Sequence, residues 1–335
     1  MKGLLRRVLL GVAAGVAVTI AFTIWANARE VGAALARFHW TAALVAAALA
    51  AGNYGLRWLR WEYYLRRLQI RIAARDSALV FLAGFALTVT PGKLGEAVKA
   101  LLLRQSHGLS AARTAPIVIA ERITDLTALL LLALVGVFSF AVDKRFLGVG
   151  AIAVGLALAV VGSEALGGRL LTLCEKVPAL ARFVPKLRVS RAAAATMLRP
   201  GALAVTTALA VGAWFLECLA FWVVVRGFPG VDIPLQAATF IYATMTVAGA
   251  LSFLPGGLGV TEAGMLAMLS TFGTGLDRGT AAAATFVTRA CTLWFAVAIG
   301  LVALVAYTRR SGIQPVGDPD AGAGPRPGSG GDSPA

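Results

Sequence analysis

Charged side chains stand inside apolar stretches of this sequence. Lys93, Glu96 and Lys99 follow one another at three-residue intervals. Charges at membrane depth are costly and usually serve a function. Arginine and lysine hold phosphate, and the N-termini of half-helices favour anions. We therefore predict a polar, phosphate-binding cavity whose acids hold the cations or carry protons. The other members predicted for this site are Arg122, Asp125, Glu262 and Arg289.

Two of these charges have predictable partners. Arg122 and Asp125 are three residues apart, so they approach one face of a helix and are expected to pair. Arg289 has no acid three or four residues away, so its partner must come from another element or from a ligand. Glu217 lies alone in its span, and it is either a structural partner of an arginine or a functional group. The alternative for the whole set is a network of internal ion pairs that locks the helices and binds no ligand.

The charges follow two breaks in the apolar pattern. Pro91-Gly92-Lys93-Leu94-Gly95 and Pro255-Gly256-Gly257-Leu258-Gly259 share one pattern, and each precedes an arginine-bearing helix. The spacing from proline to arginine is 31 residues in the first copy and 34 in the second. Repeated broken helices are typical of transporters. The residues expected to break the helices are Pro91, Gly92, Gly95, Pro255, Gly256, Gly257 and Gly259.

Each half of the first broken element, 78–103, has about 12 residues and so reaches only about 18 Å along a helix. The hydrocarbon core of a bilayer is about 30 Å thick. Two such halves favour a re-entrant hairpin that enters and leaves on one face. A single kinked span is the alternative.

Composition places these elements in a membrane. Of 335 residues, 59% are hydrophobic and only 14% are charged, so we expect an all-α, polytopic integral membrane protein. The net charge of +15 is better explained by loops that fix topology than by nucleic-acid binding. The three cysteines form no metal-ligand or disulfide pattern. No nucleotide-binding or nucleophile motif is found, so no cofactor and no enzymatic activity are expected.

The apolar runs predict about six full transmembrane helices plus two re-entrant hairpins. The basic, aromatic stretch 57–75 is expected to lie at the headgroup level, and 163–200 is expected to be a polar connection. An uncleaved first helix is favoured over a signal peptide cleaved near Ala26, and 311–335 is expected to be a disordered tail. The predicted full spans are 8–26, 40–56, 114–142, 146–162, 201–225 and 279–307.

Loop charges orient this arrangement. With the N-terminus inside, the cytoplasmic segments hold 21 Lys and Arg and the outer segments hold 6, as the positive-inside rule requires. Both termini are therefore expected in the cytoplasm, at the cell membrane. The two hairpins then enter from opposite faces, so 78–142 and 233–307 form inverted repeats within one transmembrane domain, 1–310. Binding sites in such folds lie near the midplane.

Three motifs, in order, resemble a known family. They begin at Thr90-Pro91-Gly92, at Glu121-Arg122-Ile123 and at Leu254-Pro255-Gly256. Together they are similar to the transmembrane domain of lysylphosphatidylglycerol synthases, and the resemblance covers roughly 8–310. In that family this domain is the lipid flippase, and a separate cytoplasmic domain makes the aminoacyl lipid. Only the tail follows Arg310 here, so the resemblance implies translocation of a lipid rather than synthesis.

The expected function is that of a flippase or scramblase for a phosphate-bearing lipid or lipid-linked substrate. The partners are membrane phospholipids or polyprenyl-phosphate-linked lipids, and a homo-oligomer is left open. One alternative is a membrane enzyme, or the partner of one, acting on polyprenyl-phosphate sugars. Another is a membrane assembly protein that transports nothing.

Overall fold

The computed structural model describes residues 28–89, 95–109, 111–140, 163–176, 184–252 and 254–311, with isolated residues between 148 and 160. Several predictions lie outside the described residues: the first span and its cleavage site, the Pro91-Gly92 pair with Lys93, most of the span 146–162, and the tail beyond 311.

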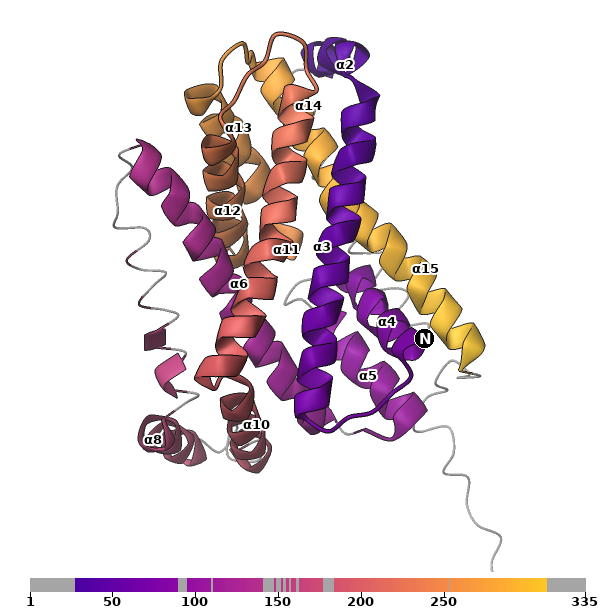
Figure 1. Cartoon of the computed structure of the whole chain (residues 1–335), viewed down its shortest axis with the longest axis vertical. Helices are drawn as coiled ribbons and strands as arrows, with labels where there is room; N and C mark the ends of the chain where they lie inside the picture. The colour runs from indigo at the N-terminus through magenta and orange to yellow at the C-terminus, as the bar shows by residue number, and fades with distance from the viewer. Residues whose placement is uncertain are drawn as a thin grey trace, which may run out of the picture.

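The part of the chain that the structure describes is all-helical (Figure 1). Pro200–Arg226 and Arg278–Arg310 are each long and apolar enough to cross a membrane, and the bent pair Ala28–Arg37 and Trp40–Arg67 passes the same test together. The elements are α2 (Ala28–Arg37), α3 (Trp40–Arg67), α4 (Ala74–Ala83), η1 (Gly84–Leu87), α5 (Gly95–His107), α6 (Ala111–Phe140), α8 (Glu164–Glu175), α10 (Val184–Met197), α11 (Pro200–Arg226), α12 (Leu235–Leu251), η3 (Pro255–Gly257), α13 (Val260–Phe272), α14 (Arg278–Arg289), η4 (Ala290–Trp294) and α15 (Phe295–Arg310).

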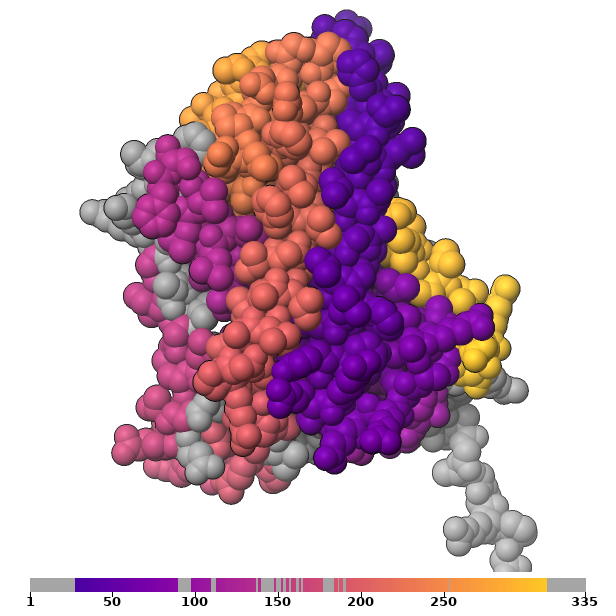
Figure 2. All heavy atoms as spheres, viewed as in Figure 1, coloured from indigo at the N-terminus to yellow at the C-terminus, as the bar shows by residue number. Residues whose placement is uncertain are grey.

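Helix α3 corrects the prediction that its span ends at Leu56. The helix continues to Arg67, and Arg60, Trp61 and Tyr64 are at most 1% exposed. The first half of the basic stretch is therefore protein interior rather than a separate interfacial helix. Helix α3 packs along α11, and Figure 2 shows their surfaces in contact down one face of the molecule.

The connection 163–200, predicted to be polar, contains helices. It contains α8 and α10, and the Ser163 side chain caps α8 by accepting a hydrogen bond from the Leu166 backbone N–H at 3.3 Å. Helix α10 packs against α6. This polar connection is therefore built of helices.

At the second predicted break the helix is interrupted, and η3 separates α12 from α13. The first predicted break falls between η1 and α5, on residues outside the described part of the chain. Helices α12 and α13 run antiparallel, because Gly249 approaches Gly257 while Met245, one turn earlier, approaches Gly264. Gly256 and Gly259 have positive φ angles of 62° and 88°, which glycine adopts without a Cβ penalty.

The two breaks meet each other. Val89, just before the first break, packs in a buried cluster with Leu258, just after the second, and with Leu293 and Val297 of the last span. In Figure 1, α4 and α5 lie in the lower half of the molecule while α12 and α13 lie in the upper half. The hairpins therefore approach a common middle from opposite ends.

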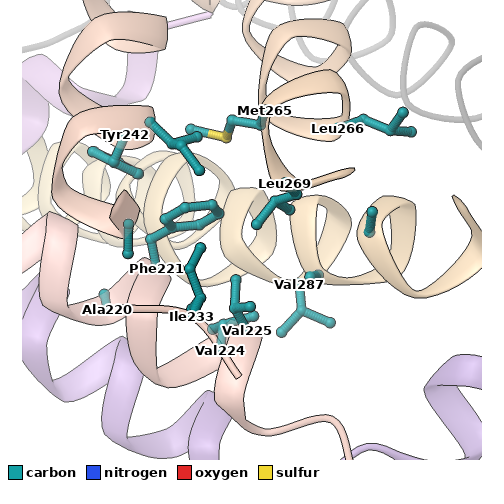
Figure 3. Close-up of a cluster of buried hydrophobic side chains, with 14 of the residues drawn as sticks. Ala220, Phe221, Val224, Val225, Ile233, Tyr242, Met265, Leu266, Leu269 and Val287 are labelled. Carbon is teal, nitrogen blue, oxygen red and sulfur yellow. The ribbon is translucent and has the colours of Figure 1, made fainter. Parts of the chain in front are cut away.

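A larger apolar cluster fixes the second hairpin. Side chains of α11, α12, α13 and α14 converge in it (Figure 3), with Phe221 at its centre and Met265 and Leu269 against it. Phe221 and Leu269 are fully buried. The hairpin is thus held by packing over its length, and polar contacts at its tip add to the apolar contact of Leu258 with Val89.

Candidate functional site

The first hairpin is tied to α6 by a buried ion pair. Lys99 Nζ of α5 lies 3.0 Å from Glu121 Oε2 of α6, and both side chains are under 10% exposed. The same ammonium lies 4.6 Å from the centre of the Trp61 ring and 5.4 Å from that of Phe81. Lysine is a compact charge that these rings and the carboxylate enclose, so Lys99 is bound by protein on several sides.

Asp125 pairs with an arginine that the sequence analysis assigned to the interface. Arg60 Nη1 lies 2.7 Å from Asp125 Oδ1, whereas the expected partner, Arg122, lies 3.6 Å from the other oxygen. Trp214 Nε1 also donates to Asp125, at 3.1 Å. The Arg60 side chain is fully buried and that of Arg122 is 36% exposed. The predicted Arg122–Asp125 pair is present, but Arg60 is the closer partner.

At the second hairpin, Arg289 holds the break itself. Its Nε lies 2.6 Å from Glu262 Oε1, and its Nη2 donates to the Gly256 carbonyl at 2.7 Å. Glu262 Oε2 accepts the Gly259 backbone N–H at 2.6 Å, which satisfies one free donor at the start of α13. The partner of Arg289 therefore comes from another element, as predicted. One arginine thus connects the last span, the broken backbone and the N-terminus of the half-helix.

Glu217 is a further buried acid. Glu217 of α11 accepts a hydrogen bond from the Tyr242 hydroxyl at 2.7 Å, rather than forming the arginine ion pair considered in the sequence analysis. It lies within electrostatic reach of Arg57 and Arg289, and Arg57 is in turn within reach of Asp125. We call the charges at the two hairpins, together with Arg57 and Glu217, the charged network.

Of the predicted site residues, Lys99, Arg122 and Asp125 gather around the first hairpin, and Glu262 and Arg289 around the second. Lys93 and the Glu96 side chain lie outside the described residues. Sequence reasoning missed the contribution of α3, although a signal existed: its polar side chains recur at helical spacing on one face. That stripe comprises Asn53, Arg57, Arg60 and Tyr64.

The surface also has a depression of about 380 Å³ where α3 begins beside α11, lined in part by Thr41, Val45, Trp222 and Arg226. Arg57 follows Val45 by about 18 Å along the helix axis. The depression is therefore separate from the charged network, which is the chemically more specific feature of the molecule.

The sequence is similar to those of known membrane proteins. Residues 12–300 match the family described as the lysylphosphatidylglycerol synthase TM region. A UPF0104 membrane protein of Methanothermobacter thermautotrophicus is 24% identical over 310 residues, which cover 86% of this chain and 90% of that protein. A second match of the same description and organism is 32% identical over 91 residues, which cover 27% of this chain and 26% of the relative.

Proposed function

Because the chain belongs to the lysylphosphatidylglycerol synthase TM family, we propose that this membrane-embedded protein translocates a phosphate-bearing lipid or lipid-linked substrate across the cell membrane. The observation that carries the proposal is the meeting of two broken helical hairpins, with Arg289 bonded to the broken backbone at Gly256. Folds of this kind place substrates near the bilayer midplane, at the junction of their repeats.

The charged residues supply the chemistry. In the proposed mechanism Lys93, Lys99, Arg122 and Arg289 receive the phosphate, and the acids Glu96, Asp125 and Glu262 hold the cations in place when no substrate is bound. A phosphate oxygen replaces a carboxylate oxygen at the same guanidinium, because arginine presents a fork suited to either group. Acyl chains remain in the lipid, so only the head group crosses the protein interior.

The architecture supports movement of the head group from either side. We propose that the two hairpins are re-entrant and inverted, and that both termini lie in the cytoplasm. The approach of the hairpins from opposite ends of the molecule supports this arrangement (Figure 1). Each hairpin then faces one leaflet, and their shared tips separate the two half-channels.

The test is lipid movement in proteoliposomes. The purified full-length chain is reconstituted with a fluorescent phospholipid, and the fraction reached by a membrane-impermeant quencher is followed in time. We expect Arg289→Gln to slow translocation several-fold, because the variant loses a cation at the hairpin tips. Arg66→Gln, an exposed arginine of α3, should move lipid at the unmodified rate.

Two outcomes would contradict the proposal. If the unmodified protein moves lipid no faster than protein-free vesicles, the translocation function fails. If well-folded Arg289→Gln protein keeps the full rate while Arg66→Gln does not, the site lies in the basic end of α3 instead. Full activity in both variants would favour an ion-pair network that only locks the hairpins.

A further inference from the structure

Arg57 differs from the other cations of the network. Arg60, Lys99, Arg122 and Arg289 each form an ion pair. Arg57 is half-buried, and its Nε, like those of Arg60 and Arg289, is shielded from solvent and has no hydrogen-bond partner among the described residues; what sets Arg57 apart is the lack of an ion pair. No carboxylate of the described residues lies within ion-pair distance of its guanidinium. Nothing in the described protein neutralises this charge at close range.

Two aromatic rings enclose the guanidinium. Its central carbon lies 5.4 Å from the centre of the Phe85 ring and 5.7 Å from that of Trp214. Ring faces attract a cation and restrict its position, but they accept no conventional hydrogen bond. The contacts therefore hold Arg57 in place and leave its N–H donors available for an anion.

Asn53, one helical turn before Arg57, carries a second polar atom without a partner among the described residues. Its side chain is fully buried, and its Nδ2 donates to the Ala213 carbonyl at 2.7 Å. Its Oδ1 has no hydrogen-bond partner among the described residues. Buried polar atoms are normally paired. A ligand that carries both an anion and a hydroxyl group would supply partners for Arg57 and for Asn53.

The location of Arg57 connects it to the proposed path. Phe85 belongs to η1, directly before the first break, and Trp214 belongs to α11 and also donates to Asp125. Arg57 thus lies where the first hairpin, α3 and α11 meet. An anion bound here would contact the hairpin through one ring and the ion-pair network through the other.

We propose that Arg57 is the cation that first receives the phosphate of the substrate, in a site walled by Phe85 and Trp214. This inference rests on the proposed function and refines it. Arg60, which is already paired with Asp125, then acts as scaffold. The recognised chemistry is a phosphate monoester or diester with a neighbouring hydroxyl, and inorganic phosphate offers the same charge without the lipid.

Binding to the detergent-solubilised full-length chain tests the site. Three probes are titrated separately: short-chain phosphatidylglycerol, inorganic phosphate and uncharged short-chain diacylglycerol. Tryptophan fluorescence gives the signal, and the Trp214→Phe variant shows whether Trp214 is its source. We expect phosphatidylglycerol to bind and diacylglycerol to bind far more weakly. The Arg57→Gln variant should bind phosphatidylglycerol at least about tenfold more weakly than the unmodified protein, because it loses a charge-assisted contact. Saturation by inorganic phosphate alone with equal affinity would overturn the assignment to a lipid.

Matched variants separate binding from folding. Arg66→Gln, on the same helix but exposed, should bind as the unmodified protein does. Arg57→Gln should lower the thermal midpoint only slightly, because it removes two cation–π contacts but no described ion pair. If Arg57→Gln does not fold, Arg57→Lys decides, since lysine keeps the charge but not the bidentate fork and should bind several-fold more weakly. Unmodified affinity in the folded Arg57 variant overturns the proposal.

Translocation assays on the same preparations distinguish this site from the function. If binding depends on Arg57 but the unmodified protein moves no lipid, the site stands and the proposed function falls. If the unmodified protein moves lipid and Arg57→Gln binds and transports equally well, the function stands and the site falls.

Discussion

At the scale of single residues, the partners of each cation separate structural roles from binding roles. Arg60 is fully buried and lies 2.7 Å from Asp125, while Arg122 is 36% exposed and lies 3.6 Å from the same acid. A buried charge depends strongly on its partner, and an exposed one is partly screened by its surroundings. Asp125 should therefore be coupled mainly to Arg60.

A double-mutant cycle tests this order. Asp125→Asn should lower the free energy of unfolding by about 3–5 kcal/mol, because it leaves Arg60 buried without its carboxylate. Arg60→Gln should cost a similar amount, and combining the two should recover part of the loss. Unfolding in mixed micelles gives both the coupling of Arg60 to Asp125 and that of Arg122 to Asp125. A coupling for Arg122 as large as that for Arg60 would reject the ranking.

At the scale of elements, the second hairpin depends on close backbone approach. A Cβ on Gly249 of α12 would overlap the Thr261 hydroxyl and lie 3.3 Å from the Gly257 Cα. Gly257 itself has a φ angle of 68°, because the turn between α12 and α13 requires this backbone conformation. Small residues at such contacts let helices pack tightly in membranes.

Gly249→Ala should therefore destabilise the protein by about 1–3 kcal/mol through overpacking. The matched control is Gly55→Ala in α3, where a Cβ would meet nothing within 4 Å; it should be neutral or stabilising by up to about 1 kcal/mol. Thermal unfolding of both variants checks the difference. Equal midpoints would show that the hairpin opens easily at this position.

The start of α14 predicts a pH effect. Asp277 caps this helix by accepting the Thr280 backbone N–H at 2.6 Å, and this bond, with help from Arg37, holds the pKa of Asp277 below its ordinary value. A lowered native pKa stabilises the fold above the unfolded pKa and loses that effect as pH falls through the native value. Asp277→Ala should cost about 1 kcal/mol at neutral pH. Asp277→Asn, which still caps the helix, should lose less stability below about pH 4 than the unmodified protein does. An equal loss of stability at acid pH in both proteins would contradict this.

Elements with local signals could be predicted from the sequence. A Pro-Gly pair marks the break between α12 and α13, which the sequence predicted, although a single proline or glycine in an apolar run can stay helical, as Pro116 does in α6 and Gly55 does in α3. The end of α3 was not predicted, because the burial of Arg60 depends on Asp125, which is distant in the chain and becomes a neighbour only in the folded protein. The Glu262–Arg289 pair was expected only in general terms, as a partner from another element. Local pattern thus predicts where a helix begins and breaks, and tertiary pairing decides which charges it can bury.

At the scale of the whole molecule, the packing of the hairpin tips indicates a shared middle. Val89 and Leu258 pack together, and Arg289 bonds the broken backbone from the last span. The ends of the two hairpins lie toward opposite ends of the molecule (Figure 1). If this axis is the membrane normal, the loop after α5 and the loop after α13 must emerge on opposite faces.

Cysteine labelling tests that arrangement. In a background with Cys174, Cys218 and Cys291 replaced by serine or alanine, Arg104→Cys and Thr274→Cys each add one exposed thiol. A membrane-impermeant maleimide should label Thr274→Cys in intact cells and Arg104→Cys only after permeabilisation, because cations concentrate on the cytoplasmic side. Labelling of both from one side would mean that the hairpins enter from the same face. The tips would then meet without separating two half-channels, and the network of Arg57, Glu217 and Arg289 would have to lie on a one-sided path.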